Sequence, residues 1–458
     1  NIPNYAEFYE ARHFTAGKNE VTYVNINGEE VPFGANILFK TDACEDFVLA
    51  VEICEDLWTA MPPSVNHALA GATIIANLSA SNEVIAKDEY REMLVKSQSA
   101  KLYCGYIYSD AGYGESTTDL VFAGDNMIAE NGTILARSKR FNNECVYTEL
   151  DLERLVGERK KSNTYNIVGS EKYVSVKLDM NIGDTKITRY VDKQPFVPSD
   201  DKKREKRSEE ILSIQSLGLK KRLDHTHAKT AVVGVSGGLD STLALLVTVR
   251  AFDSLNLDRK NIIAVTMPCF GTTDRTYNNA VNFANSLGVT LKEVNIKAAV
   301  NQHFADIEHD PNVYDVTYEN SQARERTQIL MDVANKSGGL VIGTGDMSEL
   351  ALGWATYNGD HMSMYGVNAG VPKTLIRYLV DYEAKRTNND ILKKTLQDIL
   401  DTPVSPELLP PKDGKISQKT EHIVGPYELH DFFLYHLMRF GSKPSKILRL
   451  AEVAFDGI

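Results

Sequence analysis

A glycine-rich turn between a predicted strand and a predicted helix constrains the fold of this chain most. Residues 236–241 read Ser-Gly-Gly-Leu-Asp-Ser, after a β-branched run at 230–235 and before an apolar helical stretch at 239–252. Glycines let the backbone approach a ligand closely, and a helix N-terminus offers unpaired N–H groups to an anion. The turn therefore predicts a phosphate site, although a plain strand-to-helix turn capped by Ser and Asp fits the same residues.

The residues around this turn indicate the kind of phosphate site and the kind of sheet. The lysine of the Walker pattern is absent, and Asp240 stands in the first helical turn, where a carboxylate can hold Mg²⁺ beside a polyphosphate. Predicted strands and helices alternate from about residue 209, which favours a doubly wound parallel sheet with ligands beyond the carboxyl ends of its strands. The expected strands are 262–267, 289–295 and 340–342, and the expected helices are 274–287 and 320–336.

Several polar residues follow these later elements. Thr344 stands at a strand end, where it can contact adenine or ribose, and Glu349 can complete a Mg²⁺ shell, although Ser348 and Glu349 also suit helix capping. The turn at 353–360 suits an aromatic ligand with hydroxyl groups, or an ordinary core and turn. Lys373 opens a helix after a proline, where a cation opposes the helix dipole, so we expect it to face an anion.

Residue 320 begins the predicted helix at 320–336. We expect Asn320 to be its N-cap, and the nearby Arg324 and Arg326 either bind phosphate or lie on a solvated face.

The first half of the chain predicts a second α/β unit. Expected strands at 47–53, 72–78 and 106–108 alternate with expected helices at 63–70 and 89–103, and Asn131-Gly132 predicts a hairpin. Cys54 directly follows the first of these strands. It can present a thiolate nucleophile at a sharp strand exit, or it can be an inert core cysteine.

Composition narrows the classes of partner and location. The formal net charge is −12, which disfavours broad contact with nucleic acid or anionic lipid. The five cysteines are scattered and the sequence has no run of membrane-spanning length, so we expect a cytoplasmic protein. Residues 192–208 combine prolines with mixed charges and predict an exposed linker.

Taken together, ten motifs resemble the glutamine-dependent NAD⁺ synthetase family, which joins a nitrilase-like glutaminase to an ATP-pyrophosphatase domain. The matching strings are PNYAEFYEARHF (3–14), EICEDLW (52–58), ANLSAS (76–81), GESTTDLVF (114–122), SGGLDS (236–241), ENSQARER (319–326), GTGDMSELALGWATYNGD (343–360), VPKT (371–374), TPVSPELLP (402–410) and GPYELHDFFLYHLMRFG (425–441).

The resemblance implies the fold and its limits. Residues 1–191 are expected to form part of a nitrilase-like α-β-β-α sandwich, residues 192–208 a linker, and residues 209–458 a doubly wound, adenine nucleotide α-hydrolase-like domain. The family's catalytic glutamate and lysine are expected upstream of Asn1, and its basic, proline-containing segment beyond Ile458, as in a chain truncated at both ends.

The resemblance also implies the roles of individual residues. Cys54 attacks glutamine to form a thioester and release ammonia, and Tyr5, Ser81 and Lys87 hold the glutamine, Lys87 standing where an arginine is common. Mg²⁺ is held by Asp240 and Glu349. ATP is bound by Gly234, Val235, Ser236, Gly237, Gly238, Leu239, Asp240, Ser241, Thr344 and Lys373. Deamido-NAD⁺ is bound by Asn320, Arg324, Glu349, Trp354, Ala355, Thr356, Tyr357 and Asp360.

The implied activity is that of a ligase that adenylates deamido-NAD⁺ and amidates it with ammonia, acting as a homo-oligomer. Two other interpretations stay open at this point. One is a related pyrophosphatase-fold amidotransferase acting on a nucleotide base, against which stand the internal position of Cys54 and the GWATYNGD string. The other is a non-catalytic assembly subunit, against which stand Asp240, Glu349 and Cys54.

Overall fold

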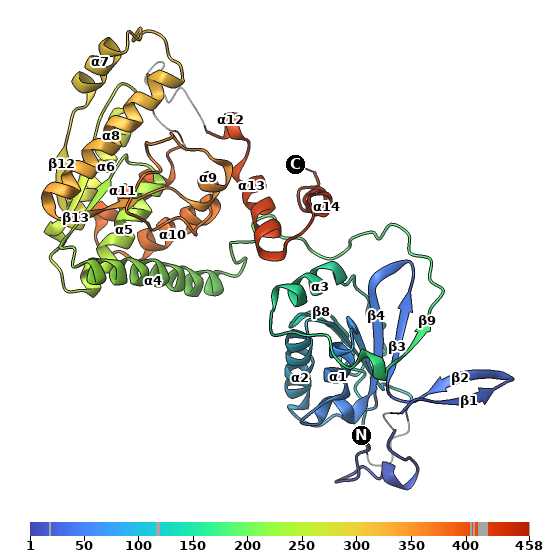
Figure 1. The fold of residues 1–458 in the computed structure, drawn as a ribbon. Coiled ribbons are helices and arrows are strands. Elements are labelled where there is room, and N and C mark those ends of the chain that lie inside the picture. The colour runs from blue at the N-terminus through green and yellow to red at the C-terminus, as the bar shows by residue number, and fades with distance from the viewer. Residues whose placement is uncertain (18–19, 116–119, 404, 406–407, 411–419, 458) are drawn as a thin grey trace. The chain divides into compact units, whose positions relative to one another are not determined.

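The computed structural model describes residues 1–17, 20–115, 120–403, 405, 408–410 and 420–457 of the 458-residue chain (Figure 1). Parts of the motifs at 114–122 and 402–410 therefore lie outside the described residues. The chain divides into two compact units. The first unit is Asn1–Val191 with Phe440–Lys446, and the second is Asp192–Arg439 with Ile447–Ile458.

A seven-stranded mixed sheet forms the centre of the first unit. Its strand order is β8 (Thr133–Arg137), β7 (Met127–Glu130), β6 (Gly105–Asp110), β5 (Ile74–Ser79), β4 (Cys44–Ile53), β3 (Ile37–Thr41) and β9 (Val174–Lys177). The three central strands β4, β5 and β6 are parallel because helices α1 (Pro63–Leu69) and α2 (Lys87–Leu102) connect them as crossovers. The predicted α/β class of this half is confirmed.

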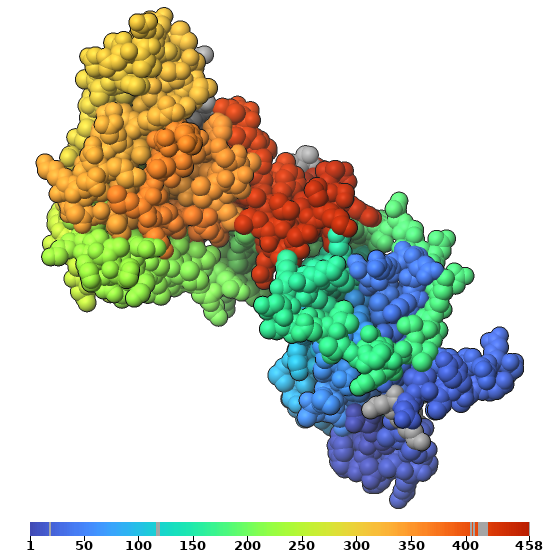
Figure 2. All heavy atoms as spheres, viewed as in Figure 1, coloured from blue at the N-terminus to red at the C-terminus, as the bar shows by residue number. Residues whose placement is uncertain are grey.

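Shorter elements complete the first unit. They are η1 (Glu10–Arg12), η2 (Cys54–Trp58), α3 (Leu152–Lys161) and η3 (Ser170–Lys172). The predicted hairpin is confirmed, since Asn131 and Gly132 have φ angles of 45° and 83° and join the antiparallel strands β7 and β8. A separate hairpin of β1 (Thr22–Ile26) and β2 (Glu29–Phe33) projects from the body of this unit (Figure 2).

The second unit is built on a five-stranded, fully parallel sheet. Its strand order is β12 (Thr290–Glu293), β11 (Ile262–Thr266), β10 (Thr230–Gly234), β13 (Gly339–Gly343) and β14 (Tyr365–Gly366). The chain proceeds from β10 to β11 on one side and returns to β13 on the other, which confirms the predicted doubly wound fold. The carboxyl ends of β10 and β13 thus flank the switch point, where such sheets bind their ligands.

The other elements after residue 200 are helices (Figure 1). They are α4 (Asp201–Thr226), α5 (Leu239–Ser254), η4 (Arg259–Asn261), α6 (Asp274–Leu287), α7 (Lys297–Asp306), α8 (Val316–Ser337), α9 (Met347–Leu352), α10 (Lys373–Arg386), α11 (Asp390–Leu400), α12 (Glu421–Val424), α13 (Tyr427–Leu434), the π-helix η5 (Tyr435–Phe440) and α14 (Pro444–Ala454). Helix α5 is buried along most of its length because apolar residues occupy nearly every side of it, as in Leu243, Val247 and Phe252. None of the helices in the described ranges has both the length and the apolar character needed to cross a membrane.

The predicted linker is only partly irregular. Residues 201–208 form the first two turns of α4, because Asp200 caps the helix by accepting a hydrogen bond from the Lys203 N–H. Ion pairs spaced three residues apart, Arg204–Asp201 and Arg207–Glu210, run along this charged segment. Mixed charge here produces a solvated helix, a structure that composition alone does not distinguish from a coil.

The predicted start of the helix at residue 320 is wrong. Helix α8 begins at Val316, and its N-cap is Asp315, whose Oδ1 accepts from the Tyr318 N–H at 3.0 Å. Asn320 therefore lies inside the helix. The β-branched and aromatic residues at 313–318 have low helix propensity, but the cap and the packing of buried Tyr318 outweigh it.

Candidate functional site

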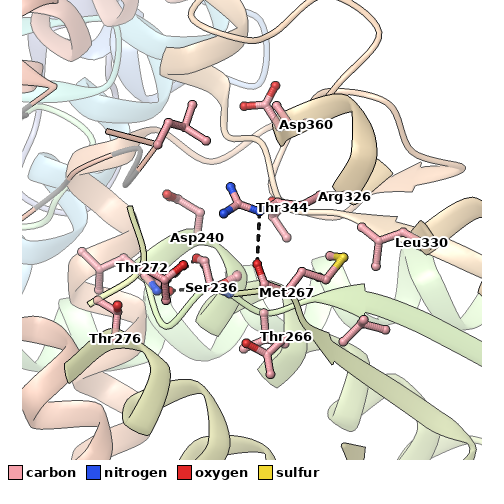
Figure 3. A pocket seen from close by; sticks show the side chains of 18 of the residues that line it. Ser236, Asp240, Thr266, Met267, Thr272, Thr276, Arg326, Leu330, Thr344 and Asp360 are labelled. Carbon is pink, nitrogen blue, oxygen red and sulfur yellow. Dashed lines mark hydrogen bonds between the residues drawn. The ribbon is translucent and has the colours of Figure 1, made fainter. Parts of the chain in front are cut away.

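A cavity of about 280 Å³ lies at the carboxyl ends of β10, β11 and β13 (Figure 3). It is the place where the strand alternation predicts a ligand. Many of the sequence-predicted residues line it: Gly234, Val235, Ser236, Gly238, Leu239, Asp240, Ser241, Thr344, Glu349, Trp354 and Asp360. The structure thus brings the glycine-rich turn and the segment after β13 to one cavity.

The turn after β10 requires glycine at its centre. Gly237 has a φ of +85°, and a Cβ placed there would lie 2.2 Å from the backbone oxygen of Thr276. The Ser241 hydroxyl closes the turn, since it accepts from the Ser236 N–H at 3.3 Å and lies 3.1 Å from the Gly238 oxygen, to which it donates. Gly238 is the N-cap of α5, so the turn and the positive end of that helix both face the cavity.

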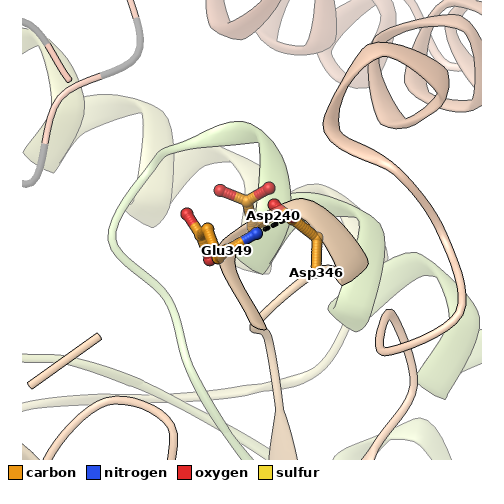
Figure 4. A group of neighbouring side chains, drawn as sticks. All are labelled: Asp240, Asp346 and Glu349. Atoms are coloured by element: carbon orange, nitrogen blue, oxygen red, sulfur yellow. Dashed lines mark hydrogen bonds between the residues drawn. The ribbon is translucent and has the colours of Figure 1, made fainter. Parts of the chain in front are cut away.

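Three carboxylates meet beside the turn (Figure 4). Ligand atoms of Asp240, Asp346 and Glu349 lie within 4.8 Å of one another. The Lys373 ammonium contacts all three, at 2.8 Å from Asp240, 2.5 Å from Asp346 and 2.8 Å from Glu349. The expectation that Lys373 faces an anion is met by these carboxylates.

The electrostatics of this cluster favour a further positive charge. Burial raises the pKa of Asp346 and of Glu349, and the nearby Asp240 carboxylate raises both further, whereas Lys373 lowers them. Burial alone would lower the pKa of Lys373, but the three carboxylates hold it well above its ordinary value. One ammonium therefore does not balance three acids, and oxygen ligands of this kind are those that Mg²⁺ prefers.

A carboxylate oxygen without a hydrogen-bond partner also indicates a cation site here. Oδ1 of Asp240 is buried and has no hydrogen-bond partner among the described residues. Such an oxygen is costly unless water or a cation satisfies it. The donor set and this free oxygen together suit a hard divalent cation.

Asp346 was not predicted as a site residue from the sequence. Its Oδ1 caps α9 by accepting from the Glu349 N–H at 2.9 Å, so the capping residue is Asp346, in place of Ser348 or Glu349. An aspartate three residues before a candidate ligand, at a strand-to-helix turn, is the sequence signal that could have identified it.

A buried amide ties the two halves of the site together. The Nδ2 of Asn368 donates to the backbone oxygens of Asp240 at 2.9 Å and Thr344 at 3.1 Å. Its Oδ1 accepts from Gln215 of α4 at 3.1 Å. Asn368 is fully buried, so its hydrogen bonds fix the loop after β10 against the loop after β13.

Other predicted residues lie outside the cavity lining. They are Gly237, Asn320, Arg324, Ala355, Thr356, Tyr357 and Lys373. The loop that follows α9 is nevertheless ordered by two of them, because the Arg324 Nε donates to the Tyr357 oxygen at 3.1 Å and the Thr356 N–H donates to Asp360 at 2.7 Å.

Sequence reasoning missed the contribution of β11. Thr266 and Met267, at the end of that strand, line the cavity, and so does Arg326, whose Nε donates to the Met267 oxygen at 3.4 Å (Figure 3). The rule that parallel strands end at one edge of the sheet could have identified the two strand-end residues.

A second candidate centre lies in the first unit, around Cys54. This residue follows β4 and begins η2 with a φ of +44°, a strained conformation for a residue with a side chain. Its N–H donates to Asn77 of the adjacent strand β5 at 3.0 Å. The strand exit predicted from the sequence is therefore sharp, and a hydrogen bond from β5 holds it.

Two of the three predicted glutamine-binding residues lie near Cys54. The Tyr5 hydroxyl donates to Glu55, the residue after Cys54, at 3.0 Å, and burial together with Glu55 raises the pKa of Tyr5. Burial and the nearby Arg91 lower the pKa of Lys87, an effect that a negative charge at Cys54 opposes. Lys87 donates to Asn82 at 2.6 Å, and its ammonium lies 5.1 Å from the ring centre of Trp58. Lys87 thus supplies a cation in the neighbourhood of Cys54.

Ser81 lies on the loop that follows β5. Its N–H donates to Asp110 at 2.9 Å, while its hydroxyl is buried without a hydrogen-bond partner among the described residues. The hydroxyl is available to a polar ligand, since a buried group of this kind is otherwise left unsatisfied.

The sequence is similar to known proteins over nearly its whole length. The NAD synthase family model matches residues 211–453. The glutamine-dependent NAD(+) synthetase of Mycobacterium tuberculosis is 43% identical over 471 aligned residues, which cover 99% of this chain and 69% of that protein. The enzyme of the same name from Aquifex aeolicus is 29% identical, with 98% and 72% covered.

Structures of similar proteins have been solved. That of the glutamine-dependent NAD⁺ synthetase from Acinetobacter baumannii, in complex with ADP, covers 98% of this chain and 69% of its own, with a TM-score of 0.41 and 21% identity. On the family model and the sequence relatives, the chain belongs to the glutamine-dependent NAD⁺ synthetase family.

Proposed function

We propose that this chain converts deamido-NAD⁺ to NAD⁺ in two steps, adenylation by ATP followed by amidation with ammonia from glutamine. The observation that carries the proposal is the meeting of the glycine-rich turn with Asp240 and Glu349 in one cavity at the switch point of the parallel sheet. A turn that binds phosphate and an adjacent carboxylate cluster are what a reaction that releases pyrophosphate requires.

In the first step, a carboxylate oxygen of deamido-NAD⁺ attacks the α-phosphorus of ATP. A new O–P bond forms, the bond to the bridging oxygen of the β-phosphate breaks, and pyrophosphate leaves. The backbone N–H groups at 236–241 bind the β- and γ-phosphates, and Thr344 contacts the adenosine. The acyl adenylate has AMP as a leaving group, which the free carboxylate lacks. Ammonia then adds to the acyl carbon, AMP leaves, and the nitrogen loses a proton to give the amide.

The carboxylate cluster is the proposed Mg²⁺ site. Asp240 and Glu349 would hold the ion, and Asp346, whose ligand atom lies within 4.8 Å of theirs, would be a third ligand. When bound, Mg²⁺ neutralises charge on the leaving pyrophosphate. Lys373, already within the cluster, would contact the ATP phosphates.

The deamido-NAD⁺ pocket is proposed for the loop after α9 and the adjacent face of α8. Trp354 and Asp360 line the cavity, and the Arg324 hydrogen bond to Tyr357 holds the loop against α8. The remaining proposed contacts are Asn320, Glu349, Ala355 and Thr356.

Ammonia is proposed to come from the first unit. The Cys54 sulfur attacks the side-chain amide carbon of glutamine, the thiol proton passes to the amide nitrogen, the C–N bond breaks, and ammonia leaves. Water then hydrolyses the thioester to glutamate. Tyr5, Ser81 and Lys87 are the proposed glutamine contacts. The unpartnered hydroxyl of Ser81 supports this assignment, and so does the position of Lys87 near Cys54.

A comparison of two nitrogen sources tests the function. The intact protein is supplied with deamido-NAD⁺, ATP and Mg²⁺, with either glutamine or ammonium, and NAD⁺ and AMP are measured. We expect both sources to be used, and Cys54→Ala to abolish only the use of glutamine. Cys145→Ala, at an exposed cysteine of the same unit, serves as the control. If ammonium supported formation of neither NAD⁺ nor AMP, the proposed function would be wrong.

Two further parts of the proposal concern assembly and location. We propose a homo-oligomer, supported by the exposed apolar residues Tyr23, Ile26 and Phe33 on the β1–β2 hairpin. Light scattering of the intact protein tests it. The cytoplasmic location stays a prediction that cell fractionation checks.

A further inference from the structure

The N-terminus of α10, which carries Lys373, is capped by residues of other helices. Pro372 precedes the helix and has no side-chain group that could accept a hydrogen bond. The Lys373 N–H instead donates to the Ser348 hydroxyl of α9 at 2.9 Å, and the Thr374 N–H donates to Asp431 of α13 at 2.8 Å. Helix ends need such partners for their free N–H groups.

Asp431 is the centre of this network. Its Oδ1 accepts from the Ser348 hydroxyl, and its Oδ2 accepts from the Thr374 N–H and, at 2.6 Å, from the Thr374 hydroxyl. The residue is 1% exposed, so its charge depends on these donors and on the positive end of α10. One carboxylate thus joins α9, which carries Glu349, to the first turn of α10.

Helix α13 also contacts the ammonium directly. Tyr427 lies four residues before Asp431, on the same face of α13. The Lys373 ammonium lies 5.3 Å from the centre of the Tyr427 ring, within cation–π range. The same helix therefore contacts both the first turn of α10, at Thr374, and the charged end of Lys373.

We propose that Asp431 is a positioning residue for the adenylation step. It holds Lys373 and Glu349 at their observed separation of 2.8 Å without touching substrate, by tying Ser348 to Thr374. This inference rests on the proposed function, because it assigns Asp431 an effect on the use of ATP.

Two substitutions test the hydrogen-bond network around Asp431, one by removing its charge and the other by removing a single donor. Asp431→Asn keeps the size but removes the charge and one acceptor. We expect kcat/KM for ATP, with ammonium as nitrogen source, to fall on the order of 10- to 100-fold. Thr374→Val removes one hydroxyl donor, for an expected loss of roughly 3- to 10-fold, and Thr374→Ser should restore the activity. Asp381→Asn, at an exposed ion pair with Lys385 on α10, is the control.

A split in the kinetic constants separates positioning from a merely structural role. All rates are divided by the concentration of folded protein, which is measured from the amplitude of the thermal unfolding transition. We expect the KM for deamido-NAD⁺ and the glutaminase rate to stay within about 3-fold of wild type, while kcat/KM for ATP falls.

The inference is overturned if Asp431→Asn and Thr374→Val lower the melting temperature but leave kcat/KM for ATP equal to that of Asp381→Asn. Should Asp431→Asn not fold, the comparison of Thr374→Val with Thr374→Ser decides, and equal constants in that pair also overturn it. Failure of wild type itself to form NAD⁺ contradicts the proposed function, a result distinct from either of these.

Discussion

Removal of the Lys373 charge should destabilise the second unit, and Mg²⁺ should restore part of the loss. Lys373→Met keeps the length and apolar stem of the side chain but leaves Asp240, Asp346 and Glu349 without the ammonium that contacts them at 2.5–2.8 Å. The Lys373 side chain is only 4% exposed, so water cannot replace it without rearrangement.

The magnitude follows from this burial. Removing one partner of a buried ion pair costs about 3–5 kcal/mol, because the remaining charge is left uncompensated. For a domain of this size each kcal/mol lowers the melting temperature by roughly 2–4 °C, so a decrease of about 6–20 °C is expected. Mg²⁺ at 100 times its dissociation constant should return about 2.7 kcal/mol if it binds only the folded cluster.

The assay is thermal unfolding of wild type and Lys373→Met, with and without Mg²⁺ and without nucleotide. Lys385→Met is the matched control, because its exposed ion pair with Asp381 on the same helix is worth at most about 0.5 kcal/mol. Equal melting temperatures for the two variants, or the same Mg²⁺ response in Lys373→Met and wild type, would refute the reasoning.

The loss of stability caused by Lys373→Met should depend on pH in a defined direction. Burial already raises the pKa of Glu349 and of Asp346 in wild type, and loss of the ammonium raises both further. A carboxyl whose pKa is raised in the folded state favours folding below its unfolded pKa, and this contribution is lost as pH rises through the folded pKa. The difference in unfolding free energy between wild type and Lys373→Met should therefore be smaller at pH 5.5 than at pH 8.

Three other substitutions test separate features. Gly237→Ala should lower the unfolding free energy by about 2 kcal/mol or more, because the φ of Gly237 is +85° and an added Cβ would clash. Calorimetry should also show ATP binding weakened at least tenfold. In the control Gly238→Ala, the added Cβ meets only an ordinary 3.4 Å contact, so the unfolding free energy should change by less than about 1 kcal/mol. Burial lowers the pKa of His67 from 6.5 to about 4, so the unfolding free energy of the first unit, measured by urea titration, should fall by roughly 3 kcal/mol as pH falls through that range. His67→Gln should reduce this dependence of the unfolding free energy on pH, whereas His13→Gln, at an exposed histidine, should not. Asn368→Asp sets a carboxylate against two backbone carbonyls and should weaken ATP binding more than Asn368→Leu; equal affinities would contradict its role in joining the two loops.

The alternation of strands and helices in the second half and the place of the cavity could be predicted from the sequence because their signals are local. The β-branched run before Ser236 and the helical period after it predict one strand–turn–helix unit, and its repetition predicts a parallel sheet. The position of Thr344 after a later strand then predicts that both segments reach the same edge. The structure has both at the cavity.

The partners of the charged residues could not be predicted, because they depend on tertiary packing. Nothing in the sequence near Lys373 indicates that its ammonium enters the carboxylate cluster, since that contact requires α9 and α10 to start side by side. Asn368 and Asp431 act through hydrogen bonds to residues 24–153 positions away. The false N-cap at Asn320 has another cause, since the true cap lies before a stretch of low helix propensity.

The pairing of β10 with β13 also bears on how the site comes into being. Thr230 pairs with Gly339, so the glycine-rich turn and the carboxylates that follow β13 are brought together only after more than a hundred intervening residues exist. At about 5–20 residues per second, a ribosome needs on the order of 5–20 s to add them. During that interval Asp240 has been made but its partners have not. The geometry of the carboxylate cluster is therefore a late product of synthesis, and closing so long a loop is slow.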